Sequence, residues 1–125
     1  MQVFFTEVVC TFIFVSLILS IKYHVKSNEG VLGAFAVSLT LFGMLCTCSS
    51  ISGGCLNPAV GLVQSIFQSL VYKYTIAKYA GEYYILNDKT YLEVLWIYVT
   101  APALGGILAG IFQLLNGKIQ KLIAE

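Results

Sequence analysis

Three apolar stretches of membrane-spanning length divide this sequence of 125 residues and leave little choice of fold. They cover residues 3–21, 30–48 and 91–115, and each holds at most one charged residue. About 20 apolar residues cross the ~30 Å hydrocarbon core as an α-helix. Lipid offers no hydrogen-bonding partner, so each backbone must satisfy itself within its helix. The sequence therefore predicts an all-α membrane protein with three transmembrane helices in a single domain, residues 1–125.

The composition supports this class and argues against several others. The chain is 58% hydrophobic, has a mean hydropathy of +0.86, and is only 10% charged, whereas soluble domains are nearer 25% charged. Its net charge of +1 gives no reason to expect nucleic acid. No nucleophile–base pair or metal-ligand spacing stands out, and His24 is interpreted as a surface residue of a polar connector. We therefore predict no enzyme, no cofactor, no metal and no disulfide framework.

The orientation of the chain is set by weak signals. Residues 2–21 are too long for the apolar region of a signal peptide and contain Glu7, so we interpret them as a mature span. The three spans place the two ends on opposite sides of the membrane. Positive charge is more frequent on the cytoplasmic side of membrane proteins, which places the C-terminus there because its side holds four lysines, Lys22, Lys26, Lys118 and Lys121.

A short polar interruption lies between the second and third spans. Small and polar residues follow Cys48, and Asn57-Pro58 then begins another apolar stretch. Asn is a good helix N-cap, and Pro is favoured at the first helical position. We predict a re-entrant loop and half-helix over residues 49–67, with the helix from Pro58 to Phe67 about 15 Å long. Such a half-helix is tolerated at membrane depth only where it faces protein or a water-filled cavity.

The segment 68–90 mixes tyrosines, lysines and apolar residues, which suits a membrane–water interface. We predict an interfacial insertion there, broken near Gly81. Trp96 and Tyr98 are predicted to anchor the start of the last span at the same interface.

Small residues recur at intervals of four along two of the spans, a spacing that lets helix backbones approach closely. Small residues are common in membrane helices, so each stripe alone is weak evidence. The candidate packing residues are Gly30, Ala34, Ser38, Ala101, Gly105, Gly106, Ala109 and Gly110.

Three stretches resemble one half of an aquaporin or aquaglyceroporin of the major intrinsic protein (MIP) family, mostly its second half. FFTEVVCTFIFV resembles the helix that opens each half. ISGGCLNPAVGL resembles the Asn-Pro-Ala loop, and WIYVTAPALGGILAG resembles the last helix of the second half. The resemblance covers nearly the whole chain in matching order. It implies half of an aquaporin-like right-handed bundle.

The resemblance also implies roles for individual residues. Asn57, Pro58 and Ala59 would form the pore motif, with the Asn57 amide turned toward the permeating molecule. Glu7, with Thr11 four residues on, would be a buried brace near the loop, because a carboxylate inside a span is costly unless it is satisfied. The alternative is that Glu7 lies close enough to the interface to reach water.

The chain departs from the family pattern where selectivity is set. The second-half loop of the family usually has Arg after Asn-Pro-Ala, but this chain has Val60 and contains no arginine. Cys55 stands where a first-half loop often has His, and it is either a small residue filling a tight loop or a thiol at the pore wall. Together with Leu45 these residues are candidates for the selectivity region. The missing arginine argues against a water-selective filter and favours glycerol-like solutes.

Two functions remain open from the sequence. The first is a channel, or half of one, for water or small neutral solutes such as glycerol. It would need a second copy in a homo-oligomer, or a second half-aquaporin chain, to supply the other Asn-Pro-Ala. The second is a non-conducting structural subunit that packs in a larger membrane complex. A channel needs Asn57, whereas a structural subunit should tolerate its loss.

Overall fold

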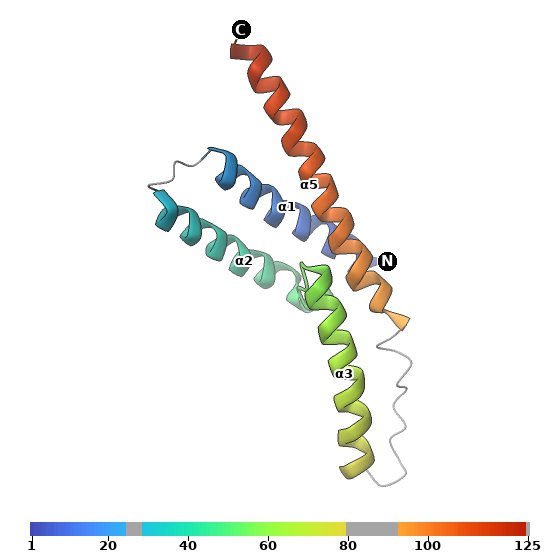
Figure 1. Cartoon of the computed structure of the whole chain (residues 1–125). Helices are drawn as coiled ribbons and strands as arrows, with labels where there is room; N and C mark the ends of the chain where they lie inside the picture. Colours follow the sequence, from blue (N-terminus) through green and yellow to red (C-terminus); the bar gives the residue numbers. More distant parts are fainter. Residues whose placement is uncertain (25–28, 80–92, 125) are drawn as a thin grey trace.

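The computed structural model describes residues 1–24, 29–79 and 93–124. Four helices account for most of them: α1 Gln2–His24, α2 Gly30–Ser52, α3 Pro58–Tyr79 and α5 Leu95–Ala124 (Figure 1). Within the described ranges there is no β-strand. Three helices are long and apolar enough to cross a membrane, over Gln2–Tyr23, Gly30–Ser52 and Leu95–Ile123. The predicted all-α fold with three spans is confirmed, and the protein is an integral, multi-pass membrane protein.

Two of the spans extend past their predicted ends. α2 continues beyond residue 48 to Ser52 because no glycine or proline stops it before Gly53. Gly53 then takes the left-handed conformation, with φ 82°, and its N–H donates to the Ser49 carbonyl at 3.1 Å, which is a common way to end a helix. α5 continues beyond residue 115, the predicted end of the last span, and ends at Ala124. Because α2 extends to Ser52, the loop before α3 is shorter than predicted.

The helix after the loop begins at Pro58, as the sequence predicts, but it is longer than a half-helix. α3 runs to Tyr79 rather than ending near Phe67, because residues 62–79 contain no glycine or proline. Its apolar part is Pro58–Val71. The first part of the predicted insertion 68–90 therefore continues α3. Residues 80–92, which include the predicted break at Gly81, lie outside the described residues.

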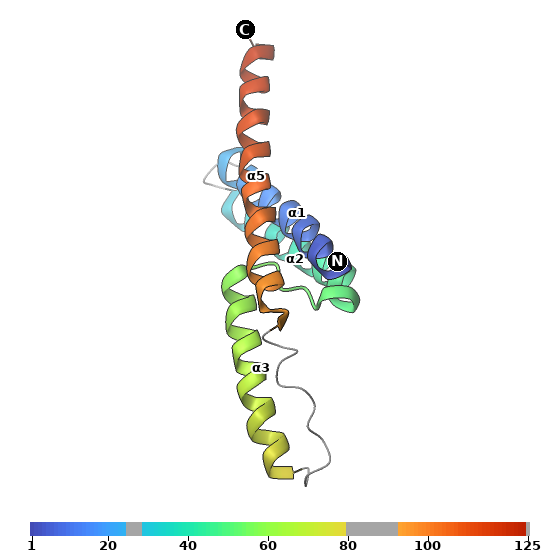
Figure 2. The ribbon, with the colours of Figure 1, turned by 90° about the vertical axis from the view of Figure 1, so that its right-hand side faces the viewer.

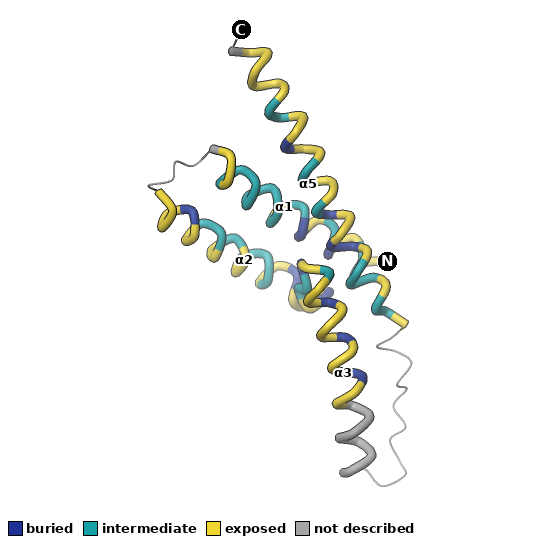
Figure 3. The backbone as a smooth tube through the Cα atoms, in the orientation of Figure 1, coloured by how far each residue is buried: buried dark blue, intermediate teal, exposed yellow. Residues whose placement is uncertain are grey.

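α1 is the central helix of the arrangement. It packs against both α2 and α5, while α3 packs against α5 (Figures 1 and 2). An edge-to-face pair, Phe12 and Phe112, joins α1 to α5 with ring centroids 5.8 Å apart. Buried positions gather where the four helices approach the loop, and the outer faces are largely exposed (Figure 3). Those apolar outer faces suit contact with lipid or with further protein.

Among the described residues, only one of the small-residue stripes closes a contact between helices. Ala101, Gly105 and Ala109 are all buried. A Cβ at Gly105 would lie 2.6 Å from the Val8 carbonyl oxygen, so the backbones of α1 and α5 touch there. At Gly106 and Gly110 a Cβ would meet nothing within 4 Å, so this part of the stripe is open.

On α2 the contact falls on a different face from the predicted stripe. Gly30, Ala34 and Ser38 are exposed, whereas Gly33 is buried with Ile21 of α1 3.0 Å from its Cβ position. α2 is apolar on all sides, so its sequence did not distinguish the packed face from the exposed one.

Candidate functional site

The loop between α2 and α3 is built on left-handed backbone conformations. Gly53 and Gly54 have φ values of 82° and 72°, and Leu56 has φ 54°. Glycine adopts this region freely, but a side chain such as that of Leu56 costs on the order of 1–3 kcal/mol there. Leu56 is 4% exposed and packs with Cys10 of α1 and Cys48 of α2. Burial of this side chain helps to offset the strain in the loop.

Glu7 of α1 binds the loop through its carboxylate. Its side chain is fully buried. Oε1 accepts a hydrogen bond from the Cys55 N–H at 2.9 Å, and Oε2 accepts one from the Leu56 N–H at 2.8 Å. Charge-assisted bonds of this kind are about twice as strong as neutral ones. Each carboxylate oxygen is thus engaged, and two backbone donors with no helical partner are satisfied.

Asn57 caps the helix that leaves the loop. Its Oδ1 accepts a hydrogen bond from the Ala59 N–H at 2.9 Å, and its carbonyl accepts from the Gly61 N–H at 2.9 Å. The residue is exposed. Because the side-chain oxygen faces the helix, the amide NH₂ is the group that Asn57 presents outward. The positive end of the α3 dipole lies beside it.

The three selectivity candidates occupy different places. The Cys55 thiol donates to the Asn57 carbonyl at 3.0 Å. Val60 is 40% exposed on the first turn of α3. Leu45 lies beneath the loop, with its Cδ2 2.7 Å from the Cβ position of Gly54. Val60 is therefore the most accessible of the three, whereas Leu45 packs against the loop and Cys55 is half-buried within it.

A polar cavity of about 450 Å³ lies beside the loop, between α3 and the start of α5. Sequence reasoning missed most of its lining. Gln64 and Gln68 lie one turn apart on α3, and their spacing of four was the available signal for a polar face on that helix. Its lining residues are Ser52, Gly53, Cys55, Gly61, Gln64, Ser65, Gln68, Val94 and Tyr98.

Tyr98 has a role that the sequence did not indicate. It was predicted to be an interfacial anchor, but its hydroxyl donates to the Ser52 carbonyl at the end of α2, at 2.8 Å. It also packs against Gly61, where a Cβ would lie 2.6 Å from the Tyr98 carbonyl oxygen. Tyr98 thus ties α5 to both sides of the loop. Trp96, by contrast, is 55% exposed.

We expect Tyr98→Phe to lower the free energy of unfolding by about 1 kcal/mol, because it removes one hydrogen bond and keeps the ring. The change leaves the Ser52 carbonyl without this donor. Thermal unfolding in detergent, followed by the fluorescence of the one tryptophan, would measure it. Tyr23→Phe is the control, because Tyr23 is 65% exposed on α1. An equal loss in both variants would contradict this role for the Tyr98 hydroxyl.

Thr11, the second predicted brace residue, packs toward α5 instead of bonding to the loop. It is 2% exposed, and its Cβ lies 2.9 Å from the Cβ position of Gly105. Its Oγ1 has no hydrogen-bond partner among the described residues. The described ranges also hold no group of three or more His, Cys, Asp or Glu side chains that could bind a metal, and their four cysteines are free thiols.

Comparison with known proteins identifies the family of this chain. The family model "Major intrinsic protein" matches residues 1–113, which contain the loop, Glu7 and most of α5. The chain belongs to the major intrinsic protein family. Members of this family are membrane channels.

One curated relative of this MIP chain is "Glycerol uptake facilitator protein-like 6" from Lactiplantibacillus plantarum. It is 30% identical over 106 residues, which are 85% of this chain and 40% of the relative. The MIP chain therefore spans about two fifths of the length of that protein. No solved structure gives a significant match.

Proposed function

We propose that this chain forms one half of a membrane pore that conducts small neutral solutes, with water and glycerol as the candidates. The observation that carries the proposal is the pair of hydrogen bonds from the Cys55 and Leu56 amides to Glu7. These bonds fix the loop so that Asn57 and the first turn of α3 face outward. Membership of the family and the name of the relative, a glycerol uptake facilitator-like protein, support the same activity.

The chemistry at Asn57 suits an uncharged solute with an oxygen atom. The amide NH₂ donates to that oxygen, and the dipole of α3 favours the same orientation. Positive potential at a helix N-terminus also repels cations and protons. The site therefore selects against cations without a cationic side chain of its own.

The polar cavity beside the loop supplies further partners for such a solute. Amides at Gln64 and Gln68 both donate and accept hydrogen bonds, and the Ser65 hydroxyl can do either. The Tyr98 hydroxyl, which donates its proton to the Ser52 carbonyl, can still accept one. Polar partners of both kinds suit a molecule with several hydroxyl groups. Val60 in place of a filter arginine removes a bulky cation and leaves an apolar position. Both features favour glycerol-like solutes over water alone.

A complete pore of this design needs a second Asn-Pro-Ala half. We propose that a second copy, or a separate half-aquaporin chain, supplies it. Two identical copies would have to insert in opposite orientations to reproduce the inverted repeat of the family. The small asymmetry of the lysines, four on one predicted side and three on the other, is compatible with such dual insertion.

The test is solute flux through proteoliposomes that contain this chain, measured by stopped-flow light scattering with an impermeant solute and with glycerol. We expect Asn57→Asp to change flux several-fold while the fold persists. Aspartate keeps the oxygen that caps Ala59 and is favoured near a helix N-terminus, but it lacks the outward NH₂ donor. The change therefore separates conduction from folding.

Flux above that of empty liposomes and altered in Asn57→Asp would support a pore formed by copies of this chain. Flux equal to empty liposomes, with the protein folded and inserted, would rule out a self-sufficient pore. Adding a candidate second half would then test whether the pore needs a different partner. A structural subunit remains the alternative, favoured by the absence of arginine, and it predicts that Asn57→Ala leaves assembly with its host complex unchanged.

A further inference from the structure

A second cavity lies well away from the loop, between the last turns of α1 and the second half of α5. Its volume is about 590 Å³, and its lining includes Leu19, Gly110, Leu114, Gly117, Lys118 and Lys121. None of the residues around Asn57 belongs to it. We call it the α1–α5 groove.

The groove changes character along α5. Gly110, Leu114 and Gly117 form its inner part, and Lys118 and Lys121 lie at its outer end. From Gly110 to Lys121 the helix rises about 16 Å. A Cβ at Gly110 or Gly117 would meet nothing within 4 Å, so these glycines leave the groove open. The groove therefore joins a mainly apolar inner part, in which Gln113 is bonded to Ser20, to two ammonium groups.

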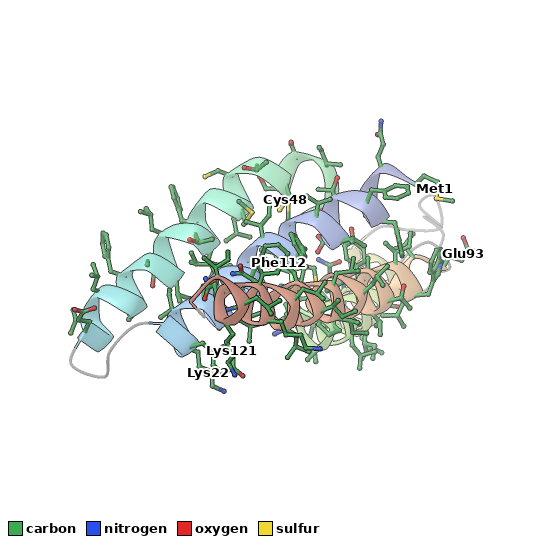
Figure 4. All side chains as sticks on the ribbon, turned by 90° about the horizontal axis from the view of Figure 1, so that it is seen from above. Met1, Lys22, Cys48, Glu93, Phe112 and Lys121 are labelled. Atoms are coloured by element: carbon green, nitrogen blue, oxygen red, sulfur yellow. The ribbon has the colours of Figure 1, made fainter. Side chains whose placement is uncertain are left out.

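The described charged side chains that line the outer end are positive. None of the described carboxylates lines the groove: Glu7 is bonded to the loop, Glu29 precedes α2, and Glu93 precedes α5. Tyr23 also lines the groove, and exposed Lys22 directly precedes it. Figure 4 shows Lys22 and Lys121 at the same end of the molecule, away from Met1 and Glu93.

We propose that the α1–α5 groove binds one anionic phospholipid. One acyl chain lies along Gly110, Leu114 and Gly117, and the phosphate meets Lys118 and Lys121. In a membrane protein the apolar inner part faces the hydrocarbon, and lysines near the end of a span reach the level of the headgroups. Basic pockets between transmembrane helices are suited to anionic headgroups. The proposal does not depend on conduction.

Lipid titration of the whole purified chain in a non-ionic detergent tests this site. Phosphatidylglycerol and phosphatidylcholine with identical acyl chains are added separately, and binding is counted by native mass spectrometry. Tryptophan fluorescence reports the unfolding midpoint in parallel. We expect one phosphatidylglycerol per chain to bind and raise the midpoint, and phosphatidylcholine to bind at least several-fold more weakly.

Two variants separate the headgroup from the acyl chain. Lys118→Gln with Lys121→Gln should weaken phosphatidylglycerol binding roughly tenfold or more, at about 1 kcal/mol for each lysine. The control, Lys73→Gln with Lys78→Gln in α3, removes the same charge elsewhere and should leave binding unchanged. Gly117→Leu keeps both lysines but fills the groove, and it should also abolish one-to-one binding.

Several results would overturn the proposal. Equal losses in the two lysine pairs, or full binding in Gly117→Leu, would mean general surface attraction rather than a built site. Competition by soluble glycerol phosphate at the concentration of the lipid would mean a site for free anions. A midpoint shift that follows dimer formation, measured by light scattering, would mean that a second copy occupies the groove.

Discussion

Glu7→Gln is expected to release the loop and to reduce any flux to the level of empty liposomes. Both oxygens of Glu7 accept backbone hydrogen bonds, from the Cys55 and Leu56 amides. Glutamine keeps one acceptor and turns an NH₂ group toward the other N–H, which leaves a buried donor unsatisfied. Since hydrogen bonds to charged groups contribute about 1.5–3 kcal/mol each, we expect a loss of about 2–4 kcal/mol in unfolding free energy.

Thermal unfolding in detergent and stopped-flow light scattering would measure the two effects of Glu7→Gln. Glu93→Gln is the matched control, because Glu93 is exposed and precedes α5; it should change neither quantity. A Glu7→Gln protein with wild-type stability and flux would show that the loop holds its conformation without the carboxylate. The assignment of Glu7 as the residue that positions Asn57 would then fail.

Gly105→Ala is expected to separate α1 from α5. The added Cβ would lie 2.6 Å from the Val8 carbonyl oxygen and 3.1 Å from the Phe12 nitrogen. Both are backbone atoms, so neither can move aside as a flexible side chain would. Overpacking of this kind costs about 1–3 kcal/mol. Detergent unfolding midpoints would show the loss.

The adjacent glycine supplies the control for that experiment. Gly106→Ala adds the same methyl group one residue further along α5, where nothing lies within 4 Å of the Cβ position. Alanine is a better helix former than glycine, by roughly 0.5–1 kcal/mol, so this variant should be unchanged or slightly more stable. Equal destabilisation in both variants would contradict the close contact at Gly105 and would indicate that the open Gly106 face is packed in the assembled protein.

The two predictions concern one structural unit. α1 carries Glu7, which binds the loop. It also carries Val8 and Phe12, whose backbone atoms contact α5 at Gly105. A carboxylate at membrane depth is tolerated only where it is paired or bonded. The α1–α5 contact and the Glu7 bonds therefore depend on each other, and we expect Glu7→Gln with Gly105→Ala to show non-additive losses.

The sequence by itself determined the features that depend on local chemistry. The hydropathy of each span predicted three membrane helices, because about 20 consecutive apolar residues in an α-helix match the thickness of the hydrocarbon core. Asn57-Pro58 predicted the start of α3, since capping and the fixed φ of proline act within one turn. The resemblance of three short stretches indicated the family without any three-dimensional information.

Only the tertiary structure decided what depends on residues far apart in the chain. The hydrogen bonds between Glu7 and residues 55 and 56 cross about 50 positions, and no local pattern specifies which donors a buried carboxylate meets. Tyr98 was predicted to be an interfacial aromatic because its hydroxyl partner, the Ser52 carbonyl, is a backbone group. Every residue carries such a group, so no sequence pattern identifies this partner. The packed stripe at Gly105 could not be told from the open stripe at Gly106, because both helix faces are equally apolar and only the neighbour, α1, distinguishes them.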